Sequence, residues 1–146
     1  MKDLTLIIPA KQESESLPIF LNQIKNLDVK KKVILDQNDN DTIKSIKNFK
    51  EVDILFQEKS GYGAALIEGI KKTDTKYFCI INADGSMEPK DVKRMYDQII
   101  KKKLNFIFAS RYEKPEGGSD DDDIVTLIGN YFFTKIGNIF FSLKLT

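Results

Sequence analysis

The sequence contains no histidine and a single cysteine, Cys79, among its 146 residues. The absence of histidine excludes Ser-His and Cys-His catalytic pairs and the commonest zinc sites. One thiol cannot form a disulfide within the chain, and Cys79 lies in an apolar run without a basic neighbour, which favours a buried structural role. Any acid–base or metal chemistry must therefore use carboxylates, amides, hydroxyls or water.

The sequence also lacks an excess of charge and a long apolar segment. Its formal net charge is +1, with 22 acidic residues, so we expect no nucleic-acid partner. No apolar stretch reaches the ~20 residues of a membrane-spanning helix. The first residues, Met1-Lys2-Asp3, lack the pattern of a signal peptide. We therefore expect a cytoplasmic protein, and the length suits one domain with a sizeable core.

Short apolar runs alternate with helical periods along the chain. The runs predict strands over residues 4–8, 32–35, 52–56, 77–81 and 105–109. Helices are expected over residues 15–26, from Asp41 or Thr42 to Lys47, and after Gly61 and Pro89. This order predicts an α/β fold with a mostly parallel central sheet flanked by helices. The run 77–81 has almost no polar alternation, which is typical of a central strand covered on both faces.

The segments that follow these strands are polar. In parallel sheets, ligands bind beyond the carboxyl ends of the strands. The sequence therefore predicts that five loops meet in space and form a ligand site: residues 11–13, 36–41, 58–63, 82–86 and 110–111.

The segment after the fourth predicted strand, Asn82-Ala83-Asp84-Gly85-Ser86, is the most informative of these loops. A divalent cation that bridges a diphosphate needs oxygen ligands on a sharp turn. Asp84, the Asn82 amide oxygen and the Ser86 hydroxyl can supply them. The competing interpretation is a plain strand-to-helix turn in which Asp84 caps the next helix.

Three charged residues at the same edge are weaker candidates. Asp36 could accept hydrogen bonds from a nucleobase or ribose, or it could cap a turn. Arg111 could clamp a diphosphate with two hydrogen bonds, although an arginine taken alone is more often solvated. Glu13 taken alone is more often a surface acid than a ligand.

The Gly61-Tyr62-Gly63 segment could expose backbone N–H groups to phosphate at a helix start. A third glycine at the dinucleotide-binding spacing and a Gly-Lys-Ser/Thr motif are both absent, so neither a Rossmann fingerprint nor a P-loop is predicted. The alternative is close packing of a helix against a strand.

The C-terminal part has a different character. Residues 113–123 are rich in glycine and aspartate, which predicts a mobile, solvated loop rather than a metal cluster. Residues 124–145 are apolar but interrupted by glycine, asparagine and lysine. This pattern predicts an amphipathic helix that faces a partner, a second copy, a missing part of the chain or a membrane surface.

Taken in order, five of these motifs resemble those of the family 2 glycosyltransferases, in particular the dolichyl- or polyprenyl-phosphate sugar transferases. They are Leu6 to Glu13, Ile34 to Thr42, Gly61 to Ala65 with Gly69, Asn82 to Ser86, and Ser110-Arg111-Tyr112. Asn82 stands where the family usually has the first aspartate of its metal pair, and Gln37 replaces another acid.

The resemblance implies a GT-A fold, a nucleoside-diphosphate sugar as donor, and Mg²⁺ or Mn²⁺ on its diphosphate. The acceptor would be a polyprenyl phosphate or a saccharide, reached from the inner face of a membrane. Residues 1–112 would form the nucleotide-sugar-binding part, and residues 113–146 the acceptor-side loop and helix of a truncated domain. The implied substrate contacts are Pro9, Lys11, Glu13, Asp36, Gly61, Gly63, Asn82, Ala83 and Arg111. The implied catalytic residues are Asp84 and Arg111, and the implied metal ligands are Asp84, Asn82 and Ser86.

Two other functions remain open on the sequence. The substitutions at positions 37 and 82 suggest a degenerate transferase fold that binds nucleotide without catalysis. A sugar-1-phosphate nucleotidyltransferase would have a related sheet. However, it would carry a glycine-rich basic loop after the first strand, and residues 9–13 do not supply one.

Overall fold

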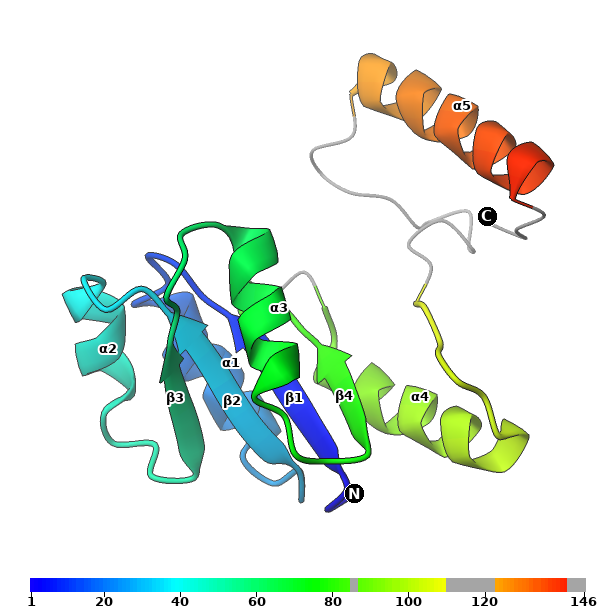
Figure 1. Ribbon diagram of the computed structural model, residues 1–146. Coiled ribbons are helices and arrows are strands. Elements are labelled where there is room, and N and C mark those ends of the chain that lie inside the picture. Colours follow the sequence, from blue (N-terminus) through cyan, green and yellow to red (C-terminus); the bar gives the residue numbers. More distant parts are fainter. Residues whose placement is uncertain (85–86, 110–122, 142–146) are drawn as a thin grey trace. The chain divides into compact units, whose positions relative to one another are not determined.

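The computed structural model describes residues 1–84, 87–109 and 123–141 and divides the chain into two units, residues 1–103 and 104–146 (Figure 1). The units are treated separately below. The boundary predicted between residues 112 and 113 falls outside the described residues and stays a prediction.

Unit 1 is built on a parallel sheet. Its strands are β1 (Leu4–Pro9), β2 (Lys30–Leu35), β3 (Val52–Phe56) and β4 (Tyr77–Ile80). They lie in the order β3-β2-β1-β4, and each pairs in parallel with its neighbours (Figure 1). The predicted α/β fold with a parallel sheet is confirmed.

Helices cover both faces of this sheet. Residues of α1 (Ser16–Ile24) and α4 (Pro89–Lys102) join one core cluster with Leu6, Ile8 and Val33. The short α2 (Asn40–Ile46) packs on α1. The other face is covered by α3 (Tyr62–Lys71), whose Ala65 packs with Ile7 and Ile34.

Gly69 allows α3 to lie close to the sheet. A Cβ atom at this position would stand 2.8 Å from Ile7 Cγ2 and 3.1 Å from Ile34 Cδ1. Both isoleucines are fully buried, so neither side chain has room to move away. The close helix–strand packing considered for Gly61 and Gly63 therefore belongs to Gly69, because no atom lies within 4 Å of a Cβ at either of the other two.

The most buried strand is β1, and the sequence pattern misidentified it. All six residues of β1 are buried, since β2 and β4 flank it and helices cover both faces. By contrast, β4 is the outermost strand on its side among the described residues, and Phe78 is 47% exposed. The prediction of a central strand at residues 77–81 was wrong, because hydrophobicity does not report the order of strands in a sheet.

The predicted fifth strand is absent from the structure. Residues 105–109 have no regular secondary structure, and the Phe106 and Phe108 side chains are 70% and 82% exposed. The described residues of unit 2 form no strand with which this segment could make a ladder.

Unit 2 also contains α5 (Ile124–Phe140), which corresponds to the predicted C-terminal helix. The Asp123 side chain caps its start by accepting a hydrogen bond from the Thr126 amide at 2.7 Å. No residue of α5 is buried. None of the helices in the described ranges is long and apolar enough to cross a membrane.

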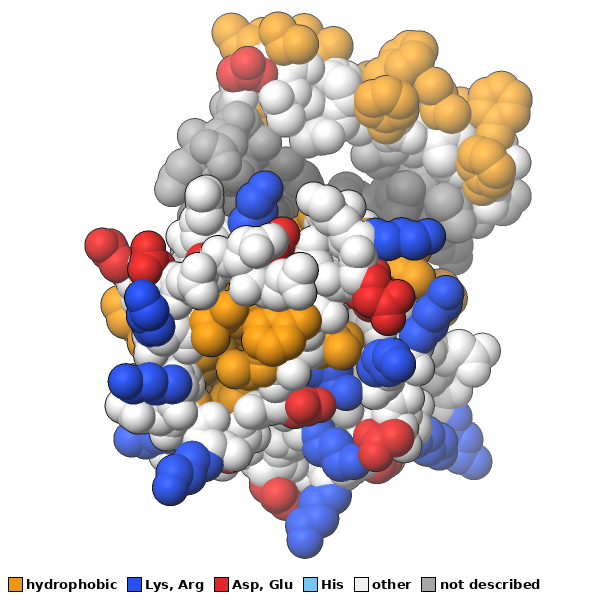
Figure 2. All heavy atoms as spheres, turned by 60° about the vertical axis from the view of Figure 1, so that its left-hand side comes forward, with side chains coloured by type: hydrophobic (Ala, Val, Ile, Leu, Met, Phe, Trp, Pro, Cys, Tyr) orange, Lys and Arg blue, Asp and Glu red, His pale blue; other side chains and the backbone are white. Residues whose placement is uncertain are grey.

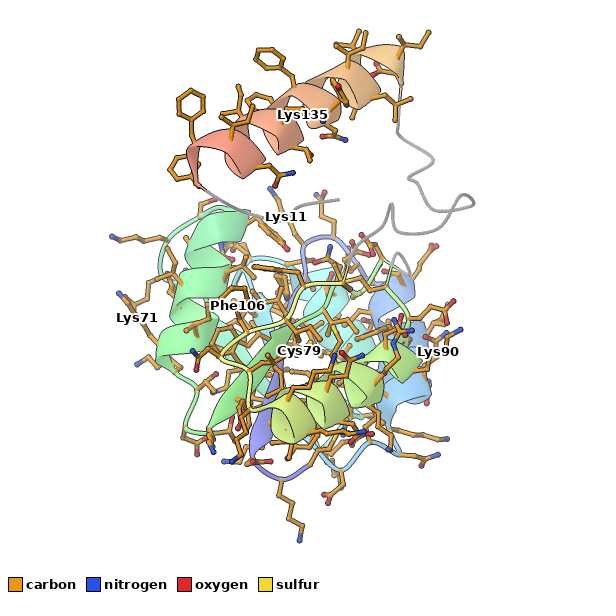
Figure 3. The ribbon with its side chains drawn as sticks, turned by 90° about the vertical axis from the view of Figure 1, so that its right-hand side faces the viewer. Lys11, Lys71, Cys79, Lys90, Phe106 and Lys135 are labelled. Carbon is orange, nitrogen blue, oxygen red and sulfur yellow. The ribbon has the colours of Figure 1, made fainter. Side chains whose placement is uncertain are left out.

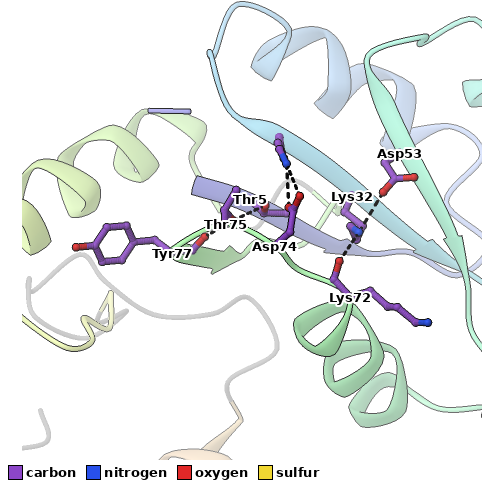
Figure 4. Close-up of polar contacts among 8 residues, drawn as sticks. Thr5, Lys32, Asp53, Lys72, Asp74, Thr75 and Tyr77 are labelled. Carbon is purple, nitrogen blue, oxygen red and sulfur yellow. Dashed lines mark hydrogen bonds and ion pairs between the residues drawn. The ribbon is translucent and has the colours of Figure 1, made fainter. Parts of the chain in front are cut away.

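The amino-terminal edge of the sheet, where the four strands begin, carries paired charges (Figure 4). Lys30 Nζ lies 2.7 Å from Asp74 Oδ2, and Lys32 Nζ lies 3.1 Å from Asp53 Oδ2. Lys32 also donates to the Lys72 carbonyl at 2.7 Å. These side chains line a cavity of about 300 Å³, and their pairing leaves it nearly neutral.

Candidate functional site

At the carboxyl-terminal edge of the sheet, the loops after β1 and β2 are joined by hydrogen bonds. The Gln12 amide donates to Asp39 Oδ2 at 2.7 Å, and the Glu13 amide donates to the Thr42 hydroxyl at 3.0 Å. Asp39 also caps α2, because Oδ1 accepts from the Thr42 amide at 3.3 Å. This contact holds Gln12 at a φ of 58°, a conformation uncommon outside glycine.

The environment of Asp39 keeps its carboxylate charged. Partial burial raises the pKa of Asp39, but the hydrogen bonds from the Gln12 amide and from Thr42 outweigh this effect. Together they hold the pKa below its ordinary value, since hydrogen bonds to a carboxylate favour its charged form. The predicted helix start at Asp41 or Thr42 was therefore late: α2 begins at Asn40, with Asp39 as its cap.

Asp36 follows β2 directly and forms a local turn. Its Oδ1 accepts from the Asn38 amide at 2.8 Å and from the Asn38 side chain at 3.0 Å. No described residue donates to its second oxygen, Oδ2, and the side chain is half-buried. Asp36 is thus a turn cap, as one interpretation predicted, and it keeps an acceptor for a ligand N–H or O–H group.

The chain beyond β4 presents polar side chains at every second residue. Ile81 and Ala83 are 2% and 3% exposed and belong to the core, whereas Asn82 is half-buried and Asp84 is exposed. The chain bends at Ala83 and Asp84, after the end of β4. The amide and the carboxylate predicted as metal ligands are therefore the two more accessible residues of this bend, next to the buried Ile81 and Ala83.

The start of α3 reaches the segment beyond β4. The Tyr62 hydroxyl donates to Asn82 Oδ1 at 3.1 Å, although the two residues are 20 positions apart. Gly61 immediately before has a φ of 113°, which other residues rarely adopt. The loops 58–63 and 82–86 were predicted to meet at this edge, and the hydrogen bond between Tyr62 and Asn82 brings the glycine turn to the segment beyond β4.

The remaining predicted residues of β1 and its loop occupy the same edge. Pro9 ends β1 opposite Ile34, and Lys11 is exposed just beyond it (Figure 3). Glu13 Oε2 accepts a hydrogen bond from the Ser16 hydroxyl. Cys79 packs against the core, and burial raises the pKa of its thiol, as expected for a structural cysteine.

Two predicted residues, Ser86 and Arg111, lie outside the described residues. Three others at this edge were not singled out from the sequence: Asp39, Thr42 and Tyr62. The spacing of Asp39 and Thr42 is that of a helix cap with its N3 residue and could have revealed the first two. Nothing in the sequence predicts that the Tyr62 hydroxyl reaches Asn82.

The donor set beyond β4 fits a small divalent cation that is shared with a phosphate ligand. Mg²⁺ is usually held by one or two protein oxygens, with substrate phosphates and water completing the shell. Asp84 supplies a carboxylate, and Asn82 Oδ1 keeps a second lone pair beside its bond from Tyr62. Within residues 1–84, 87–109 and 123–141 no group of three acidic or thiol side chains forms a closed metal cage.

The acceptors described above lie at the carboxyl-terminal edge of a parallel sheet, and sequence comparison gives a family in which this arrangement is expected. The profile described as glycosyl transferase family 2 matches residues 5–142. The chain belongs to this family. Family membership and the parallel α/β sheet both agree with the GT-A type of fold.

Several glycosyltransferases resemble the chain at low identity. An uncharacterized glycosyltransferase of Mycobacterium bovis is 26% identical over 98 residues, which cover 67% of this chain and 44% of that protein. A Mycobacterium tuberculosis counterpart gives the same figures. The UDP-N-acetylglucosamine–dolichyl-phosphate N-acetylglucosaminyltransferase of Methanococcus voltae is 24% identical over 165 aligned positions. The alignment covers 91% of this chain and 66% of that protein. The chain thus spans less than half the length of the mycobacterial relatives.

Proposed function

We propose that this chain binds a nucleoside-diphosphate sugar at the carboxyl-terminal edge of its sheet and serves in transfer of the sugar to an acceptor. The observation that carries the proposal is the segment beyond β4. Asn82 and Asp84 alternate with the buried Ile81 and Ala83, and Tyr62 of α3 contacts Asn82 at 3.1 Å. The segment therefore offers anchored oxygen donors beside a glycine-started helix, which suits a diphosphate and its cation.

The donor would be bound by groups from three loops. Asp36 Oδ2 would accept from the nucleoside, while Pro9, Lys11 and Glu13 line the same edge. Backbone N–H groups at Gly61 and Gly63 would face the phosphates, since the first amides of a helix have no partner within it. Arg111 would add a bidentate clamp on phosphate.

A divalent cation, Mg²⁺ or Mn²⁺, would be held by Asp84 and Asn82, with Ser86 as a further ligand. When bound, such an ion neutralises the charge that develops on the leaving diphosphate. The residues of this chain orient the donor: the Tyr62 hydroxyl fixes the Asn82 amide, and the hydrogen bond between Gln12 and Asp39 fixes the loop after β1.

We propose a polyprenyl phosphate as the acceptor, with a saccharide as the alternative. The Methanococcus voltae relative is named for transfer to dolichyl phosphate. A phosphate oxygen is already anionic at neutral pH and attacks without a general base, whereas a sugar hydroxyl needs one. This choice would take the chain to the inner face of a membrane, where such a lipid is found.

A thermal-shift panel tests donor binding. We expect a nucleoside diphosphate, UDP or GDP, to raise the melting temperature when Mn²⁺ is present, and Asp84→Ala to remove that rise. The matched control is Asp74→Ala, which deletes an exposed aspartate paired with Lys30 at the opposite edge and should keep the rise. If no nucleoside diphosphate or its sugar conjugate shifts the wild-type melting temperature, the proposal fails.

Binding without catalysis is the second candidate, and Asn82 motivates it. A neutral amide in place of a carboxylate removes one negative charge from the cation site and weakens the affinity for the cation. Release of nucleoside diphosphate from a donor sugar, measured with a polyprenyl phosphate present, separates the two candidates. Turnover that disappears in Asp84→Ala would exclude the binding-only role, whereas a thermal shift without turnover would support it.

A further inference from the structure

The connection between β3 and α3 leads directly into the candidate donor site. Its residues 58–61 are exposed, and Phe56 at the end of β3 is 47% exposed. The side of unit 1 that carries α2 and β3, turned forward in Figure 2, shows an apolar area surrounded by lysine and acidic side chains. A connection at such a surface makes few packing contacts, so its conformation depends on its hydrogen bonds.

Glu68 of α3 accepts hydrogen bonds from two successive amides of this connection. The Glu58 amide donates to Glu68 Oε2 at 2.8 Å, and the Lys59 amide donates to Glu68 Oε1 at 3.1 Å. Hydrogen bonds to a charged acceptor are stronger than those to a neutral one. One carboxylate therefore ties the connection to the helix that follows it.

Glu68 lies on a part of α3 that is anchored to the sheet. Its neighbour Gly69 is so close to β1 that a Cβ atom there would stand 2.8 Å from Ile7 Cγ2. Ala65, one turn earlier in the helix, is 3% exposed and packs with Ile7. The Glu68 carboxylate is therefore carried by a backbone that cannot shift easily.

The first turn of α3 needs such support. Gly61, at the N-cap, has no side chain that could accept from the first amides of the helix, and Gly63 disfavours helix within the turn. Tyr62 between them is 57% exposed, so packing does little to hold it. If the connection came loose, the turn would fray, and the Tyr62 hydroxyl would leave Asn82, which it contacts at 3.1 Å.

We propose that Glu68 is a positioning residue of the donor site: it holds the connection before α3, keeps the first turn of the helix formed, and so keeps the Tyr62 hydroxyl on Asn82. This role rests on the proposed function, because it affects binding only if the donor occupies the edge with Asn82. Charge alone predicts the opposite effect, since removal of a carboxylate favours an anionic diphosphate nearby. A loss of affinity in a Glu68 variant therefore reports on position rather than on charge.

Isothermal titration calorimetry with Mn²⁺ and UDP or GDP tests this role. Glu68→Ala should raise the dissociation constant roughly fivefold, which corresponds to about one hydrogen bond. Glu68→Gln keeps an oxygen that can accept one of the two bonds, so it should raise the constant only about twofold. The matched control is Ile67→Ala, which truncates the exposed neighbour in the same helix and should leave the constant unchanged.

A double variant separates positioning from a general loss of stability. Tyr62→Phe should also raise the dissociation constant roughly fivefold, because it removes the hydrogen bond to Asn82. If Glu68 acts through Tyr62, the double variant should again show roughly a fivefold rise. Independent effects would instead multiply to roughly 25-fold and would overturn the proposed route through Tyr62.

Hydrogen exchange without nucleotide tests the hold on the connection directly. The Glu58 and Lys59 amides should exchange slowly in the wild type and fast in Glu68→Ala, whereas the Gln57 amide, which donates to the Leu35 carbonyl at 2.9 Å, should not respond. Equal exchange in both proteins would overturn the role of Glu68, as would an unchanged dissociation constant in Glu68→Ala beside a wild type that binds. A wild type that binds neither UDP nor GDP, alone or as a sugar conjugate, would overturn the proposed function itself, and with it the role of Glu68 in the donor site.

Discussion

The two edges of the sheet satisfy their charges in different ways. At the amino-terminal edge, Lys30 and Lys32 pair with Asp74 and Asp53. At the carboxyl-terminal edge, Asp39 and Asp36 bind backbone amides instead, and neither has an ion pair within the described residues. Neutral N–H groups hold a carboxylate in place without cancelling its charge.

The paired charges of the amino-terminal edge stabilise the fold, whereas the carboxylates of the carboxyl-terminal edge can still interact with a ligand. An edge already neutralised by lysines attracts neither a cation nor a phosphate strongly. The other edge combines Asp36 and Asp39, which have no ion pair within the described residues, with a glycine turn at the start of α3. Substitutions at the first edge should therefore change stability alone, while those at the second should also change binding.

The largest effect on stability is expected at Gly69, where α3 packs against one face of the sheet. Gly69→Val should lower the free energy of unfolding by about 3 kcal/mol, because its Cβ would stand 2.8 Å from the buried Ile7 Cγ2. The matched control is Gly63→Val in the same helix, where no atom lies within 4 Å and the change should be near neutral. Urea unfolding of both variants measures the difference, and equal losses would contradict this account of Gly69.

The next effect concerns Asp39. Asp39→Ala should cost about 1–2 kcal/mol, because it removes the cap of α2 together with the acceptor for the Gln12 amide. Asp41→Ala, in the first turn of the same helix, removes only a favourable charge near the helix start and should cost less. Urea midpoints at neutral pH compare the two variants, and a larger loss from Asp41→Ala would contradict the capping role of Asp39.

The contribution of Asp39 should depend on pH in a known direction. Its folded pKa is below the ordinary 3.8, so the charged form stabilises the folded state above that pH. This contribution is lost as the pH falls through the lowered folded pKa. The stability difference between wild type and Asp39→Ala should therefore be constant from neutral pH to about 5 and shrink below about 4. A difference that grows in acid would show that the sign is wrong.

The smallest effects are expected among the lysines of the amino-terminal edge. Lys32→Met should cost roughly 1 kcal/mol, since the Lys32 side chain is only 14% exposed and contacts both Asp53 and the Lys72 carbonyl. Lys30→Met breaks an exposed pair and should show no measurable change at high salt, which screens such pairs. Denaturation at low and high NaCl separates them, and nucleotide-induced thermal shifts should be unaffected in both.

The sequence predicted the location of the candidate site better than the hydrogen bonds that position its side chains. Polar residues after each strand correctly placed Asp36 and Asn82 at one edge, because parallel strands end on the same side. The hydrogen bond from Tyr62 to Asn82 depends on how α3 crosses the sheet, which no local pattern encodes. Asp39 lies in a polar run in which several residues could begin a helix, so the sequence alone did not identify it as the cap of α2.

The errors in the predicted fold share a physical cause. Apolar runs signal burial or β propensity, but pairing decides which run becomes a strand and which strand lies inside. The 105–109 run has no regular secondary structure. The 77–81 run pairs with β1 and with no second strand among the described residues of unit 1. Both were predicted from composition, while β1 was not recognised as the most buried strand.

β1 is synthesised before the other three strands of its sheet, and its second neighbour is made much later. Leu4 pairs with Tyr77, and β1 is buried along its whole length only when β4 is in place. At a synthesis rate of ~5–20 residues per second, roughly 4–15 s pass between these two residues. During this interval an apolar strand lacks half of its ladder. The yield of folded protein in a cell should therefore depend on how well the nascent chain is shielded until Ile80 emerges.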